Sequence, residues 1–236
     1  MTSKIKTLIV LFILPFMLHS QEISFPENGY WQIGFGLGEL PTGGSFKPSI
    51  SVGYHVNEKI YAGIIYQLKD HIARNQASIN ARSSGLTGLN TASEIVAQRF
   101  LAQIRYKPFR NGPYLSTGIV FNGRDRETMV FDHRDRQLFG EEYTGDIGII
   151  QSRPAGWGLA AGVGYEYRFK NGVAAGFEWT PAWAQYPEPE YEFGGEAGLS
   201  SNTKKSLQDL MNGKFKSSVT NMYKVFHLGI SYHFQD

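Results

Sequence analysis

The sequence predicts an all-β protein, an eight-stranded antiparallel up-and-down transmembrane β-barrel with long extracellular loops. Three observations support this fold: an N-terminal segment typical of an export signal, eight segments in which apolar residues alternate with small or polar ones, and connections that are alternately short and long. Composition excludes other classes. The 236 residues are 42% hydrophobic, too many for a disordered chain, and the absence of cysteine excludes disulfide frameworks and thiolate metal sites.

The first 20 residues have the order of a secretory signal. Two lysines precede an apolar run of about 11 residues, which is too short to cross a bilayer as a helix, and small or polar residues follow it. We therefore expect residues 1–20 to be cleaved and residues 21–236 to form a single barrel domain; a buried N-terminal helix is the alternative. Cleavage removes two of the 23 basic residues and leaves 21, equal to the 21 acidic ones. A neutral chain without a basic stripe predicts no nucleic-acid partner.

Eight segments alternate with the period of two that characterises a strand. They are 31–38, 49–56, 60–68, 99–106, 115–121, 157–169, 173–180 and 225–234. The first sets Trp31, Ile33 and Phe35 against glutamine and glycine, and the second and third repeat this scheme with Ile, Val and Tyr. The fourth and fifth alternate less cleanly. The sixth is the longest and opposes an aromatic-rich face to a face of Gly, Ala, Glu and Arg. The seventh opposes Val, Ala, Phe and Trp to Ala, Gly, Glu and Thr.

The connections sort by length in the way that outer-membrane barrels show. Residues 57–59, 107–113 and 170–172 are short and rich in Asn, Gly or Pro, as hairpin turns are, and 39–47 is of moderate length. The other connections, 69–94, 122–156 and 181–222, are far longer than usual. Short turns on one rim and long loops on the other place both termini on the short-turn side, the periplasmic side of a bacterial outer membrane.

The main structural alternative is a soluble barrel whose apolar face points inward. An eight-stranded barrel is only just wide enough for side chains, so the aromatic face would not fit inside, whereas the glycine-rich polar face would. The inward face then carries five charged residues, Arg99, Arg105, Glu166, Arg168 and Glu178. They could line a pore or a proton path, but we favour a satisfied internal network because an unpaired buried charge is costly. The inward histidines fix no metal geometry, and no catalytic, cofactor or metal site is predicted.

The last segment shows the alternation most clearly. One face carries five apolar residues, Phe226, Leu228, Ile230, Tyr232 and Phe234. This pattern resembles the C-terminal signal of the small outer-membrane β-barrel proteins of Gram-negative bacteria, similar to the transmembrane domain of OmpA and to OmpX. The resemblance implies the barrel-assembly machinery as a partner and location in the outer membrane among membrane lipid and lipopolysaccharide. This segment departs from the family pattern in one respect, because Gln235 and Asp236 follow the last aromatic residue.

Two of the long connections contain local signals. Residues 128–131 and 147–150 favour strands, so we expect strands five and six to extend past the membrane as a protruding hairpin; a ten-stranded barrel is the alternative. The hairpin's alternating charges could meet lipopolysaccharide phosphates or divalent cations, but a solvated surface of mixed charge is the simpler interpretation. A short capped helix is expected from Thr203 to about Gly213.

Two functional classes remain. The first is a monomeric, non-enzymatic surface barrel whose loops serve envelope integrity, adhesion or ligand interaction. The second is an outer-leaflet enzyme that acylates or deacylates lipid A, which needs a serine and a histidine near the outer rim. The nearest candidates are His71, His133, Ser93 and Ser152, without a linked motif. Passage of a small solute is a third possibility, and it needs an open lumen.

Overall fold

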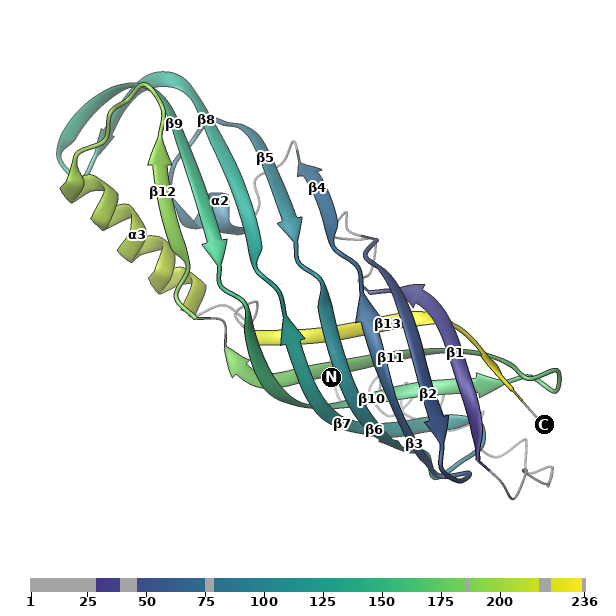
Figure 1. The fold of residues 1–236 in the computed structure, drawn as a ribbon. Coiled ribbons are helices and arrows are strands. Elements are labelled where there is room, and N and C mark those ends of the chain that lie inside the picture. Colours follow the sequence, from purple (N-terminus) through teal and green to yellow (C-terminus); the bar gives the residue numbers. More distant parts are fainter. Residues whose placement is uncertain (1–28, 39–45, 75–78, 186, 217–221, 235–236) are drawn as a thin grey trace, which may run out of the picture.

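The computed structural model describes residues 29–38, 46–74, 79–185, 187–216 and 222–234. The expected signal peptide lies outside the described residues. Eight strands close into an antiparallel barrel in the order β1-β13-β11-β10-β7-β6-β3-β2 (Figure 1). They are β1 (Tyr30–Leu37), β2 (Pro48–His55), β3 (Ile60–Gln67), β6 (Arg99–Tyr106), β7 (Gly112–Asn122), β10 (Gly156–Arg168), β11 (Val173–Gln185) and β13 (Met222–His233). The predicted fold class is confirmed.

Pairing between the first and last strands closes the barrel. Gln32 lies opposite His233 and Leu37 lies opposite Leu228. Closure leaves no barrel strand with an unpaired edge, which is the condition for a sheet to cross lipid.

The short turns gather at one end of the barrel, where β1 begins and β13 ends. Their asparagines hold the backbone: Asn57 Oδ1 accepts hydrogen bonds from the N–H groups of Lys59 and Ile60, both at 2.9 Å, and Asn171 Oδ1 accepts one from Val173 at 3.2 Å. Such Asx turns explain why asparagine marks these connections.

A second sheet stands above the other rim of the barrel (Figure 1). Its order is β12-β9-β8-β5-β4, with β4 (Asp70–Arg74), β5 (Leu89–Val96), β8 (Asp125–Leu138), β9 (Glu141–Arg153) and β12 (Glu190–Gly194). Each strand follows or precedes a barrel strand, so the barrel wall continues upward. We call this sheet, with the helices α2 (Ile79–Ser83) and α3 (Ser201–Lys216), the head.

The head has an apolar core of its own between the sheet and α3. Its buried members are Ala81, Ala92, Met129, Phe131, Ile147, Ile149, Leu199, Leu207 and Met211. The protruding hairpin expected from the sequence is therefore present as β8 and β9. The ten-stranded alternative is wrong, because both of these strands pair within the second sheet.

The structure differs from expectation in the other two long connections. The helix expected from Thr203 to about Gly213 is present as α3. The strands β4, β5 and β12 and the helix α2 were not expected, because short strands gain their stability by pairing with β8 and β9. The cap of α3 also differs. Ser200 Oγ accepts a hydrogen bond from the Thr203 N–H at 3.2 Å, so Ser200 and not Thr203 caps the helix.

The two faces of the barrel wall follow the predicted alternation. Outward residues such as Trp31, Phe35, Trp157 and Leu159 are 55–64% exposed, while polar residues fill the interior. The soluble barrel with an apolar interior is therefore wrong. In the described part of the chain, no helix is long and apolar enough to cross a membrane.

Candidate functional site in the barrel lumen

The lumen holds side chains of both charges. The structure places the five charged residues singled out from the sequence inside the barrel, each at most 7% exposed: Arg99, Arg105, Glu166, Arg168 and Glu178. They do not form one group. Two clusters of different composition hold four of them, and Arg99 lies apart near the head.

The first cluster centres on Glu178 of β11. Arg105 Nη2 of β6 lies 2.6 Å from Glu178 Oε2, with both side chains at most 4% exposed. The same carboxylate accepts hydrogen bonds from Gln103 Nε2 at 3.2 Å, from the Tyr114 hydroxyl at 3.1 Å and from Thr180 Oγ1 at 2.8 Å. A buried ion pair persists when further hydrogen bonds satisfy the carboxylate, and this cluster provides them.

The second cluster centres on Glu166, nearer the short turns. Its carboxylate pairs with Lys107, accepts a hydrogen bond from Gln32 Nε2 at 3.1 Å and lies 3.8 Å from Arg168 Nη2. Arg168 also donates to the Tyr30 hydroxyl at 2.7 Å. Cations thus surround Glu166 on one side of the lumen.

Aromatic rings and histidines pack around these charges. The Arg105 guanidinium lies 4.6 Å from the ring centre of Tyr61 and 5.0 Å from that of Tyr114, within cation–π distance. The His55 ring stacks on Tyr30 at 4.4 Å and bonds Gln32 Oε1 at 2.8 Å. The inward histidines are therefore packed with rings and polar groups. Among the described residues, no group of three metal-ligating side chains forms.

An apolar layer separates these clusters from the head end of the lumen. Its members, each at most 1% exposed, come from six strands: Ile65, Leu101, Val120, Ala160, Ala182 and Val225. Leu101 lies between Arg99 and Gln103 on the inward face of β6, which fixes the layer's height. On the head side, Arg99 Nε donates to Asn122 Oδ1 at 2.6 Å. The lumen is thus filled by polar, apolar and polar side chains in succession.

Tyrosines occupy the space beside the inward glycines. A Cβ atom on Gly164 would lie 2.2 Å from Cζ of Tyr114, and one on Gly53 would lie 2.4 Å from Cζ of Tyr61. The glycine-rich inward face predicts room for the charged side chains, but the rings of Tyr61 and Tyr114 take much of that room. Sequence reasoning did not single out Tyr61 and Tyr114, although both fall on the inward parity of their strands.

The candidate residues for a lipid-modifying enzyme do not assemble. Among the described residues, no hydrogen bond links His71 or His133 to Ser93 or Ser152; His133 Nδ1 instead lies 3.0 Å from Glu196 Oε2. These four residues therefore do not form a pair of nucleophile and base.

Charged groups in the head lock the β8–β9 hairpin. Arg136, 9% exposed, donates to the carbonyl of Gly145 and to Asp132 Oδ1, both at 2.8 Å. Hydrogen bonds from Arg134, and to a smaller extent the charge and hydrogen bond of Arg136, lower the pKa of Asp132. A hydrogen bond from the Tyr143 hydroxyl lowers the pKa of Glu141 in the same way.

Tyr191 of β12 connects the sheet to α3. Its hydroxyl accepts a hydrogen bond from Gln151 Nε2 and donates one to Asn212 Oδ1, both at 3.0 Å. Burial raises the pKa of Tyr191 to about 12. The phenol therefore remains a donor at neutral pH.

Comparison with known proteins gives a likeness in fold and none in sequence. No protein-family model and no curated protein matches the chain. Among solved structures, CarO2 from Acinetobacter baumannii aligns with a TM-score of 0.58 at 10% identity, over 87% of this chain and 98% of that one. CarO from the same organism aligns with a TM-score of 0.53 at 10% identity, over 91% and 100% of the two chains.

Proposed function

Since the chain has the fold of the small outer-membrane β-barrels, we infer that it is a non-enzymatic protein of the bacterial outer membrane. We propose that it presents its head outside the cell for envelope integrity, adhesion or ligand interaction. The observation that carries this proposal is the contrast between a lumen filled by buried side chains and a head with an ordered sheet, two helices and a core of its own.

The height of the apolar belt supports membrane insertion. Along β10 the outward residues run from Trp157 to Tyr167, and Phe169 follows in the turn. At about 3.4 Å per residue and a tilt near 40°, this stretch spans roughly 30 Å, close to the hydrocarbon thickness of a bilayer. The belt also begins and ends with aromatic residues, as interfacial girdles do.

The filled lumen argues against passage of solutes. Leu101, Val120 and Ile65 are buried in the apolar layer, and Glu178 and Glu166 are held by cations beneath it. A channel would need these groups to leave well-satisfied positions. The head continues directly from the barrel wall, which places its recognition surface on a rigid frame.

The orientation follows from the export route. A cleaved signal leaves the N-terminus in the periplasm, and an even number of strands returns the C-terminus there. The head then lies outside, with Arg124 and Arg126 exposed just above the apolar belt. Their charge suits lipopolysaccharide phosphates, which we propose as neighbours of the barrel alongside membrane lipid.

Shortening the head tests this proposal. Arg126 pairs with Ser152 across the hairpin, so residues 127–151 can be replaced by Asn-Gly while the pair of Asp125 and Arg153 below keeps its register. We expect this variant to keep the mobility difference between heated and unheated samples that marks a closed barrel, yet to fail in restoring the envelope or adhesion defect of a deletion strain.

Two controls accompany the shortened variant. Wild-type chain must restore the strain, and Glu142→Gln, an exposed change in the hairpin, should behave like wild type. Full restoration by the shortened chain would remove the head from the function. Mass spectrometry of lipid A from the same strains separates the enzyme alternative, because altered acylation in the deletion strain would favour it.

A further inference from the structure

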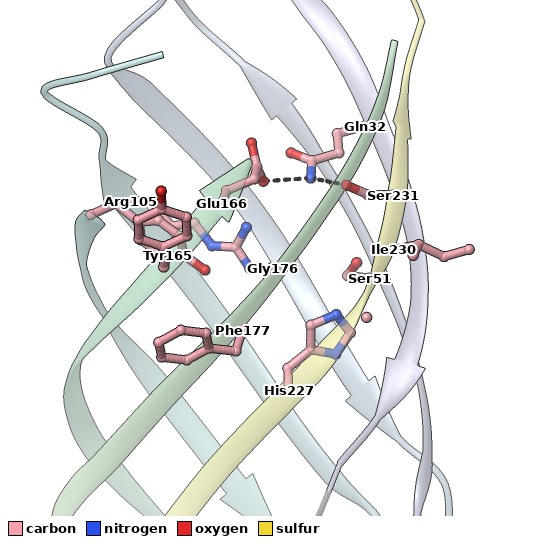
Figure 2. Close-up of a pocket in the computed structure, with 12 residues that line it drawn as sticks. Gln32, Ser51, Arg105, Tyr165, Glu166, Gly176, Phe177, His227, Ile230 and Ser231 are labelled. Carbon is pink, nitrogen blue, oxygen red and sulfur yellow. Dashed lines mark hydrogen bonds between the residues drawn. The ribbon is translucent and has the colours of Figure 1, made fainter. Parts of the chain in front are cut away.

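A small polar cavity lies in the lumen beside Arg105 (Figure 2). Arg105 also forms the ion pair with Glu178. Six of the side chains that line the cavity are polar or charged and come from five strands, namely Gln32, Ser51, Arg105, Glu166, His227 and Ser231, and the ring of Tyr114 lines it as well. Its volume of about 20 Å³ admits one particle of water or halide size. Sulfate and organic acids are too large for it.

We propose that this cavity binds a small monovalent anion of halide size, such as chloride. The cavity is lined by hydrogen-bond donors that an anion could accept from. Arg105 Nε is buried without a hydrogen-bond partner among the described residues, and Arg105 is 4% exposed. An unpartnered guanidinium N–H in a buried site is costly, and an anion in the cavity would accept from it.

Two hydroxyls and an imidazole add further donors. Ser231 Oγ accepts a hydrogen bond from Gln32 Nε2 at 2.8 Å, so its own O–H can be donated. Ser49 Oγ lies 2.9 Å from His227 Nδ1; when that hydroxyl donates, His227 Nε2 carries the proton and becomes a donor. With the Ser51 hydroxyl, which lines the same cavity, these groups can surround a halide with N–H and O–H donors.

The charges of the two lumen clusters do not balance. The two clusters contain three cations, Arg105, Lys107 and Arg168, against two carboxylates, Glu166 and Glu178. A net charge in a dry interior is unfavourable unless a counter-charge accompanies it. One bound anion restores neutrality.

Glu166 is the one lining group that would repel an anion. Its Oε1 pairs with Lys107, and its Oε2 accepts from Gln32 at 3.1 Å. These partners offset its charge and occupy both of its oxygens, whereas Arg105 Nε keeps an N–H that no described group accepts.

The test measures thermal unfolding of the refolded protein in detergent. Sodium chloride, bromide, gluconate and sulfate are compared at constant ionic strength. We expect chloride and bromide to raise the midpoint above its value in gluconate, because a ligand that binds only the folded state stabilises it by mass action. Sulfate raises the midpoint of proteins generally by its exclusion from their surface, so its effect should be the same in wild type and in a variant that lacks a cavity donor.

Two serine variants make the test specific. Ser51→Ala removes a cavity hydroxyl and should raise the chloride concentration at half-saturation about tenfold. A hydrogen bond to a charged group contributes at least the free energy that corresponds to a tenfold change in affinity. Ser116→Ala removes a lumen hydroxyl that bonds Thr180 and Glu178 and does not line the cavity. It should therefore keep the wild-type half-saturation by chloride, whatever it does to the midpoint itself. Equal responses in both variants would overturn the assignment.

A crystal of the wild-type protein grown in bromide gives an independent readout that does not depend on any variant folding. We expect an anomalous peak among Arg105, Ser51 and Ser231. A water molecule without anomalous signal at that position would overturn the proposal, even if the barrel proves to be an outer-membrane protein as proposed above.

Discussion

Arg105 Nη2 on β6 and Glu178 Oε2 on β11 lie 2.6 Å apart inside the barrel, and the strands that carry them are separated by β7 and β10 in the sheet. The contact therefore bridges strands that are not neighbours. It ties opposite parts of the wall together in a way that backbone pairing cannot.

Breaking this bridge should destabilise the barrel strongly. Glu178→Gln keeps the size of the side chain but leaves Arg105 with an uncompensated buried charge, so we expect the free energy of unfolding to fall by about 3–5 kcal/mol. Urea titration in lipid vesicles measures this loss. Glu192→Gln, an exposed change in the head, is the matched control, and an equal small effect of both would mean that the bridge contributes little.

The pairing of Gly164 with Tyr114 predicts a second effect. Gly164→Ala places a Cβ atom 2.2 Å from the ring, which overpacks the lumen and should cost about 1–3 kcal/mol. Tyr114→Phe keeps the ring and removes only the hydroxyl, so it does not relieve the clash. A double-mutant cycle with Tyr114→Ala should show strong coupling, whereas additive losses would contradict the assigned contact.

Much of the barrel could be predicted from the sequence because its two faces meet different surroundings. Lipid accepts the large apolar residues on one face, and a narrow lumen selects glycine and polar residues on the other, so alternation identifies all eight strands. The head could not be predicted in the same way. β4 and β12 have five residues each, and their stability comes from pairing with strands distant in the sequence.

The same limit applies to the lumen. Parity places Arg105 and Glu178 inside, but it cannot show which charges meet across a barrel or that Tyr61 and Tyr114 occupy the space beside glycines. Parity places Gly162 on the inward, small and polar face and so predicts that Gly162→Ser is tolerated, yet a Cβ atom there would lie 2.4 Å from Thr180 Oγ1. Close packing, which no periodicity reports, decides such cases.

Val163 tests the lipid-facing side. It is 49% exposed on the outer face of β10, so Val163→Arg should lower the free energy of unfolding in vesicles by about 2–4 kcal/mol if it lies near the midplane. Val163→Leu keeps an apolar group there and should be neutral. Equal tolerance of both substitutions would place this position in water and not in lipid.

The head should loosen at acid pH through Glu141. Hydrogen bonds from Tyr143, Ser200 and Thr203 lower its pKa in the folded state. The ionised carboxylate therefore stabilises the head above the unfolded value of about 4.3, and this contribution is lost as the pH falls through the lower folded value. Hydrogen exchange of β9, corrected for the intrinsic rate, should speed up below about pH 4. In Glu141→Gln the acid-dependent part of this change should disappear; its persistence would assign the effect to another group.

Surface labelling of single cysteines tests directly whether the head faces outward from the outer membrane. Each label is specific because the chain has no cysteine of its own. Gln137→Cys lies exposed near the tip of the head hairpin, and Glu58→Cys lies exposed in a short turn at the other end of the barrel. We expect a membrane-impermeant maleimide to label Gln137→Cys on intact cells and to label Glu58→Cys only after the outer membrane is opened. Labelling of Glu58→Cys on sealed cells, with Gln137→Cys protected, would contradict an outer-membrane barrel that displays its head to the outside.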